Sequence, residues 1–87
     1  DVTFLHLSPD RYLMITGSGF GIRDSGWLAR HLPDGVTMRE VTNAYATLNL
    51  CGPKSREVLA RITSSDLSSD AFPFLALREI EIGMAPV

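Results

Sequence analysis

The sequence predicts a small α+β protein whose elements follow the order β-β-α-β-β-α-β. Three patterns support this prediction: two β-type runs at the start, a strand that leads directly into a helix in the middle, and an alternating run near the end. We expect one mixed or antiparallel sheet with two helices on one face, forming a sandwich. With 87 residues, the chain is expected to form a single domain over residues 1–87.

The first two strands form a predicted hairpin. Residues 2–7 and 11–16 are rich in β-branched, aliphatic and aromatic side chains. The segment Ser8-Pro9-Asp10 between them consists of residues that favour turns.

The next two elements are a helix and a third strand. Residues 22–32 carry an apolar stripe at helical spacing, and Asp24 or Ser25 is a candidate cap for the helix start. The segment Pro33-Asp34-Gly35 ends this helix, and the alternation in residues 36–41 predicts a strand.

The strand-to-helix step spans residues 45–62. Residues 45–50 alternate polar and apolar side chains, as expected of a half-buried strand, and apolar residues then return at helical spacing. Gly52 permits a sharp turn, and Pro53 suits the first helical position because its missing N–H would have no partner there. Glu57 and Arg61 have the spacing of a favourable ion pair on the helix.

The last part of the chain is a polar connector followed by a strand. Residues 63–70 are expected to form a loop or a single helical turn, and residues 77–82 alternate as a strand does. Gly83 signals a turn, after which residues 83–87 read as the start of a return strand. We expect both chain ends to be cuts within a longer protein, and the strand edge near residues 77–87 to promote self-association.

Composition argues against several classes of function. The net charge is −2 and the eight Lys and Arg residues are scattered, which favours neither nucleic acid nor a membrane surface as a partner. The uncharged runs are too short to span a bilayer. The single cysteine cannot form an internal disulfide, which fits a reducing compartment.

A glycine cluster follows the second strand. Gly17, Gly19 and Gly21 lie where a phosphate-binding loop would lie, and Glu40 is near the distance expected of a ribose-binding acid. The spacing is nevertheless Gly-x-Gly-x-Gly, and Ile22 stands where the dinucleotide fingerprint would have its last glycine. The favoured interpretation is a strand-to-helix connection that needs positive φ, with dinucleotide binding as the alternative.

Metal binding and cysteine catalysis receive little support. His6, His31 and Cys51 are far apart in the sequence and lack the close spacing of zinc ligands, so we predict no metal. Cys51 is expected to be buried at the end of a strand, with a nucleophilic role as the alternative, because a helix N-terminus follows it.

Three aromatic residues lie at predicted element boundaries. They could stack on a ligand, but such residues in a small domain most often belong to the core. They are Trp27, Phe72 and Phe74.

A set of residues along the whole chain carries a resemblance to a known family. The clearest motif is the Leu-x-Leu-x-Gly-Pro step in residues 48–53; the others are Asp1-Val2-Thr3, residues 11–16, Trp27-Leu28, Val58-Leu59 and residues 66–74. In this order they resemble the aminomethyltransferase family, which comprises the folate-dependent T-protein of the glycine cleavage system and the homologous C-terminal portions of dimethylglycine and sarcosine dehydrogenases.

The resemblance implies transfer of a one-carbon unit from an amine to tetrahydrofolate. It covers nearly all of this chain but only a middle section of the family domain. FAD is implied only if an oxidase domain lies upstream, and the implied location is the bacterial cytoplasm or the mitochondrial matrix. The family uses an aspartate just before the first of these strands to orient or activate the folate amine, and Asp1 occupies the matching position.

Two other hypotheses stay open alongside this one. The chain could come from a non-catalytic regulatory relative that keeps the fold, or from an unrelated α+β domain that binds a small molecule through its glycine loop. The sequence of the longer parent protein would discriminate best among the three.

Overall fold

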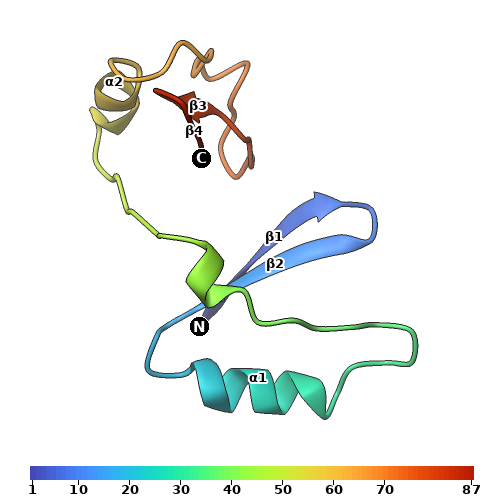
Figure 1. Ribbon diagram of the computed structural model, residues 1–87. Helices are drawn as coiled ribbons and strands as arrows, with labels where there is room; N and C mark the ends of the chain where they lie inside the picture. Colours follow the sequence, from blue (N-terminus) through green and yellow to red (C-terminus); the bar gives the residue numbers. More distant parts are fainter. The chain divides into compact units, whose positions relative to one another are not determined.

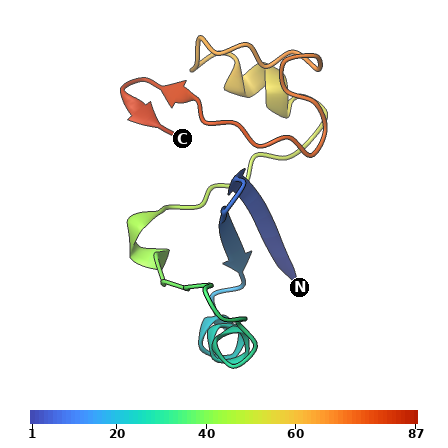
Figure 2. The ribbon, with the colours of Figure 1, turned by 90° about the vertical axis from the view of Figure 1, so that its right-hand side faces the viewer.

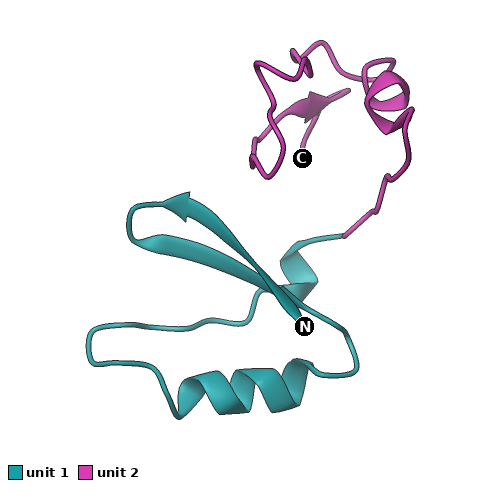
Figure 3. Cartoon of the chain, turned by 180° about the vertical axis from the view of Figure 1, so that it is seen from behind, with its two compact units in different colours: residues 1–46 teal, residues 47–87 magenta.

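The computed structural model describes residues 1–87 and divides the chain into two compact units, Asp1–Ala46 and Thr47–Val87 (Figure 3). We describe the two units separately and call them unit 1 and unit 2. The predicted α+β class is confirmed, since the chain contains two helices and two antiparallel sheets of two strands each. The prediction of one domain stays a prediction.

Unit 1 begins with the predicted hairpin. Strand β1 (Val2–Ser8) pairs antiparallel with β2 (Arg11–Thr16), and a bulge precedes the turn (Figure 1). The Ser8 hydroxyl donates a hydrogen bond to the Asp10 carboxylate at 3.0 Å across the turn. The hairpin is therefore confirmed almost residue for residue, because its strand pattern and its turn residues are both local signals.

Helix α1 (Gly21–Ala29) begins one residue before the predicted start and ends three residues before the predicted end. Neither Asp24 nor Ser25 caps it, which corrects the expectation; Ser25 instead donates its hydroxyl proton to the backbone oxygen of Ile22. Figures 1 and 2 place α1 on the side of the hairpin's open end.

The chain returns from α1 without forming the predicted strand over residues 36–41. Gly35 turns the backbone with φ +83°, and the segment then runs extended into a single 3₁₀ turn, η1 (Thr42–Ala44) (Figure 2). Val36 and Met38, two apolar residues of the alternating pattern, are about half exposed. A strand requires a hydrogen-bonded neighbour, and no segment of unit 1 pairs with this one.

The second predicted strand that is missing is residues 45–50, which run extended without a pairing partner. Leu48 is 93% exposed as a result. Gly52 makes the predicted turn, with φ +120°, and α2 (Ser55–Leu59) follows. This helix is shorter than predicted, and Pro53 lies just before its N-cap residue.

The predicted ion pair between Glu57 and Arg61 is not formed; the structure contains a single ion pair, between Arg23 and Asp24. Helix α2 ends at Leu59, so Arg61 lies beyond it and the helical spacing that favours such a pair is lost.

Unit 2 is organised by one arginine on α2. The Arg56 guanidinium donates to three backbone oxygens of the connector: that of Leu67, that of Ser68 at 3.3 Å and that of Phe72 at 3.1 Å. Leu67 is the one buried residue of the chain, at 6% exposure. The connector is thus a folded loop tied to α2.

The chain ends in a short hairpin. Strand β3 (Glu81–Ile82) pairs antiparallel with β4 (Ala85–Pro86), and Gly83 turns between them with φ +63°. Reciprocal backbone hydrogen bonds of 2.8–2.9 Å between Ile80 and Val87 extend the pairing. The return strand is confirmed, whereas the strand expected over residues 77–82 is shorter. Self-association through this edge stays a prediction.

Much apolar surface is uncovered in both units. The accessible area is 7,980 Å² for 9.5 kDa, whereas two separate compact units of this mass would expose about 6,000 Å². Large apolar side chains that are at least 90% exposed include Ile22, Leu48 and Phe74. No helix here has the length and hydrophobicity that crossing a membrane requires.

Candidate functional site

Asp1, the candidate catalytic residue, lies at the open end of the unit 1 hairpin. It directly precedes β1, and the antiparallel register places its neighbour Val2 opposite Thr16, the last residue of β2 (N in Figure 1). The Asp1 side chain is exposed and forms neither a side-chain hydrogen bond nor an ion pair within the chain. Its carboxylate is therefore free to accept a proton or a hydrogen bond from a ligand.

A second carboxylate, Asp24, is fixed at the same end of the hairpin. The Thr16 hydroxyl donates to Asp24 Oδ2 at 2.5 Å, which connects the end of β2 to the first turn of α1. Arg23 forms a salt bridge with Asp24 Oδ1 at 3.0 Å. The Asp24 side chain is only 16% exposed, whereas that of Arg23 is 68% exposed.

These contacts determine the ionisation of Asp24. The hydrogen bond from Thr16, then the one from Arg23, hold the pKa of Asp24 below its ordinary value. Asp24 is therefore a carboxylate at neutral pH whose oxygens already have donors. It is suited to hold structure in place, while Asp1 is the carboxylate that remains free.

The glycine cluster forms the turn between β2 and α1. The Phe20 N–H donates to the Gly17 backbone oxygen at 2.9 Å, and a Cβ on Gly17 would lie 3.2 Å from the Phe20 ring. None of the three glycines has positive φ, so the expectation on that point is wrong; the close Phe20 ring is what favours glycine at position 17. The Asp24 carboxylate at the helix start disfavours a phosphate there. Glu40 lies exposed in the returning segment.

The other candidate residues do not assemble into a site. His6 stacks on Tyr12 with ring centroids 4.7 Å apart, and His31 stacks on Trp27 at 4.0 Å. Cys51 is exposed, which corrects the expectation of burial, because the segment before it pairs with no strand. No cluster of three or more His, Cys, Asp or Glu side chains is close enough to hold a metal ion.

The candidate core aromatics are also uncovered within this chain. Trp27 is 54% exposed and Phe74 is 91% exposed, while Phe72 is of intermediate exposure and lies beside the Arg56 guanidinium, 5.8 Å from its ring centroid. The aromatic side chains therefore do not form a shared core in either unit.

A shallow depression in unit 2 has no counterpart among the predicted sites. It measures about 390 Å³ and lies between α2 and the connector; its lining residues are Pro53, Arg56, Glu57, Ala60, Leu67 and Ser68. One guanidinium nitrogen of Arg56 is already engaged by backbone oxygens and is therefore not available to a ligand in this depression. The periodicity of the sequence does not predict this depression, because the backbone oxygens that accept hydrogen bonds from Arg56 lie 11 to 16 residues further along the chain.

Comparison with known proteins supplies the family. The family model of the GCVT N-terminal domain matches residues 1–87. The chain belongs to this family. The resemblance predicted from the sequence is thereby confirmed.

The named relatives are longer proteins than this chain. Mitochondrial dimethylglycine dehydrogenase of Homo sapiens is 36% identical over 90 residues, covering 100% of this chain and 10% of its own length. Sarcosine oxidase subunit alpha of Corynebacterium sp. (strain U-96) is 39% identical over 89 residues, covering 94% and 9%. The aminomethyltransferase of Listeria monocytogenes is 28% identical over 72 residues, covering 83% and 20%.

The chain thus spans about a tenth of the length of the dehydrogenase and oxidase relatives. No solved structure matches it.

Proposed function

We propose that this chain is part of a folate-dependent domain that transfers a one-carbon unit from an amine, either glycine-derived or an N-methylglycine, to tetrahydrofolate. The observation that carries the proposal is the family match over all 87 residues, together with 36–39% identity to dimethylglycine dehydrogenase and sarcosine oxidase subunit alpha. The activity belongs to the longer protein, and the isolated chain is expected to be inactive.

Asp1 is the residue to which we assign the proton transfer. Tetrahydrofolate, when bound, supplies the nitrogen that takes up the carbon. As the new C–N bond forms and the bond from the carbon to the donor group breaks, the Asp1 carboxylate would accept the proton that is released, and the donor would leave as the free amine. A base in this position accelerates such a step by typically 10²–10⁴-fold.

The chemistry of the residues fits this role. Asp1 has no internal donor, whereas Asp24, the other carboxylate at this end of the hairpin, is occupied by Thr16 and Arg23. The Asp1 carboxylate is open to the N–H of a folate amine, whereas each Asp24 oxygen already has an internal donor. FAD belongs to the proposal only where an oxidase domain precedes this one, and no metal is invoked.

The proposed location follows from the same relatives. The dehydrogenase relative is a mitochondrial protein and the other two are bacterial. We therefore propose the mitochondrial matrix or the bacterial cytoplasm.

The test is Asp1→Asn in the full-length protein, with methylene-tetrahydrofolate and formaldehyde followed together. Turnover should fall by 10²–10⁴-fold while folate affinity changes little, because asparagine keeps the size but loses the basic oxygen. Where an oxidase domain is present, amine oxidation should continue and formaldehyde release should rise.

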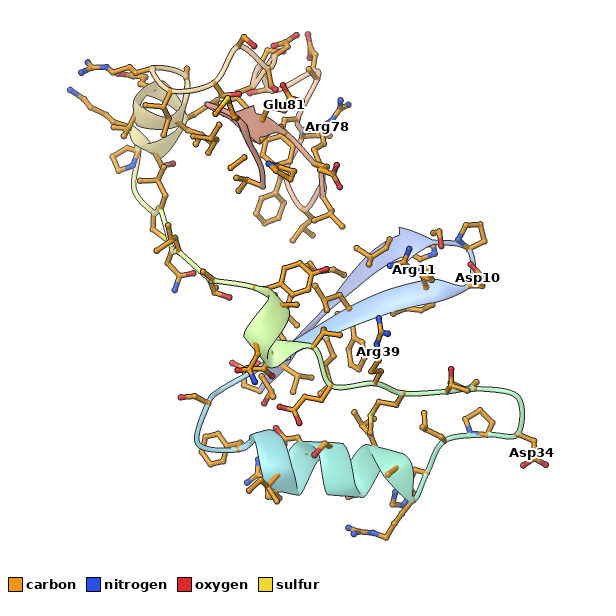
Figure 4. The ribbon with its side chains drawn as sticks, viewed as in Figure 1. Asp10, Arg11, Asp34, Arg39, Arg78 and Glu81 are labelled. Carbon is orange, nitrogen blue, oxygen red and sulfur yellow. The ribbon has the colours of Figure 1, made fainter.

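Asp34→Asn is the matched control. Asp34 is an exposed acid in the loop after α1 and is expected to have no effect (Figure 4). An unchanged turnover and product ratio in Asp1→Asn would remove Asp1 from the mechanism. A parent protein that makes no methylene-tetrahydrofolate at all would favour the regulatory relative instead.

A further inference from the structure

We infer that Thr16 and Asp24 are positioning residues for Asp1, acting as a clamp that holds the open end of the hairpin against α1. The inference rests on the proposed function of Asp1 and extends it to two residues to which no role has been assigned. It is carried by three observations on unit 1: the strand register, the hydrogen bond between the two side chains and the low exposure of the Asp24 side chain.

The register connects the clamp to Asp1. Val2 pairs with Thr16, and Asp1 is the residue next to Val2. Strand ends fray unless they are tied down, and a carboxylate that must meet a substrate proton requires a fixed backbone. Thr16 is the residue of β2 that pairs with Val2, so a contact that holds Thr16 also holds the strand end beside Asp1.

The hydrogen bond provides that restraint. Thr16 donates at 2.5 Å to a carboxylate, which makes this a charge-assisted hydrogen bond, and Asp24 is only 16% exposed. Arg23 holds the other Asp24 oxygen at 3.0 Å, and the Arg23 guanidinium lies 4.5 Å above the Phe20 ring. The acceptor is thus itself held on two sides.

Thr16 also differs from the other side-chain hydroxyl contacts of unit 1. Ser8 and Ser25 form bonds within their own turns, to residues two and three positions away. The Thr16 bond spans eight residues and connects two secondary-structure elements. Its loss therefore releases one element from another and not merely a local turn.

The decisive experiment compares Thr16→Val with Thr16→Ser in the full-length protein. Valine keeps the shape of threonine and removes the donor, while serine keeps the donor. Thr16→Val should lower methylene-tetrahydrofolate formation by roughly 10- to 100-fold, as expected for a misplaced catalytic group, with tetrahydrofolate affinity within about twofold. Thr16→Ser should restore most of the rate. Asp24→Asn should give a smaller loss than Thr16→Val, because its amide oxygen can still accept the bond.

Thr63→Val controls for a general loss of stability. Thr63 donates a hydrogen bond of 2.6 Å to the backbone oxygen of Glu81 in unit 2, so the same substitution removes a similar bond elsewhere. It should leave the rate within about twofold of wild type.

Asp1→Asn is measured in parallel, so that the two proposals fail separately. A loss in Asp1→Asn without a loss in Thr16→Val would overturn the clamp and leave the role of Asp1 intact. An unaffected Asp1→Asn would remove Asp1 from the mechanism, and the clamp would then have no catalytic residue to position. Equal losses in Thr16→Val and Thr63→Val would show that only stability was changed, which also overturns the clamp.

Discussion

Replacing Arg56 should loosen the connector of unit 2 more than any other single change on α2. One guanidinium donates to the backbone oxygens of Leu67, Ser68 and Phe72, and the first of these belongs to the one buried residue. Arg56→Ala would remove all three bonds at once. A hydrogen bond to a charged group contributes about 1.5–3 kcal/mol where it is shielded and less where it is exposed. Only the bond to Leu67 is partly buried, so we expect a loss of about 2 kcal/mol.

Hydrogen exchange measures this loss locally. The Phe72 N–H donates to Ser68 at 2.7 Å, and its exchange reports on opening of the connector. A loss of about 2 kcal/mol should accelerate that exchange roughly thirtyfold in the full-length protein, since 1.36 kcal/mol corresponds to a factor of ten.

Two controls separate the geometry of the guanidinium from its charge. Arg56→Lys keeps the charge but has no planar fork, so it should recover less than half of the loss. Arg61→Ala removes an arginine near the same helix that forms no side-chain hydrogen bond or ion pair, and it should change exchange by less than about threefold. If Arg56→Ala left the exchange of residues 67–72 unchanged, the Arg56 hydrogen bonds would not hold the connector in place.

Two further predictions concern the pH dependence of the stability of unit 1 and the backbone turn at Gly52. The depressed pKa of Asp24 should stabilise unit 1 fully above the ordinary aspartate pKa of about 3.9, and this stabilisation should be lost as pH falls through the lower folded value. Unfolding curves of wild type and Asp24→Asn should therefore differ at neutral pH and converge in acid, and a constant difference down to pH 2 would contradict the assignment. Gly52→Ala should destabilise the protein by about 1–3 kcal/mol because Gly52 has φ +120°, although its added Cβ meets no neighbour. Gly19→Ala, with no positive φ and the same open space, should be close to neutral in the same denaturation measurement.

The parts of the fold that sequence predicted well are those determined by neighbours in the chain. The first hairpin depends on Ser8-Pro9-Asp10 and on β-type runs that flank it, and the structure confirms it. Gly52 and Gly83 were predicted to turn the chain, and both have positive φ. These features need no information from distant residues.

The strands predicted over residues 36–41 and 45–50 are absent, because a strand also depends on a distant partner segment. Alternation indicates that one face of a segment is to be covered, but it does not indicate what covers it. Leu48 and Leu50 keep the alternating pattern, and yet no segment of the chain pairs with them. The alternating pattern indicates that these apolar side chains are suited to burial, but these 87 residues contain no segment that covers them.

The candidate site was predicted in the same uneven way. Family resemblance directed attention to Asp1, whereas Asp24 was interpreted as a helix cap because an acid in the first turn commonly serves as one. In the structure, the Asp24 carboxylate instead accepts a hydrogen bond from the Thr16 hydroxyl. The available signal was a hydroxyl residue at the end of a strand and an acid in the following helix turn, separated by a short glycine connection. Such a pair can bond across the turn, but sequence alone cannot exclude the cap.

Exposure of the apolar side chains bears directly on the proposed chemistry. Proton transfer to a carboxylate is effective when the site excludes water and the base has fixed geometry. This chain supplies the second condition through Thr16 and Asp24, but the Asp1 carboxylate is itself exposed, as are apolar side chains of both units. The dehydrogenase and oxidase relatives that match this chain are about ten times as long. We therefore expect the exclusion of water to depend on parts of the longer protein, which is why the Asp1 and Thr16 variants must be measured there.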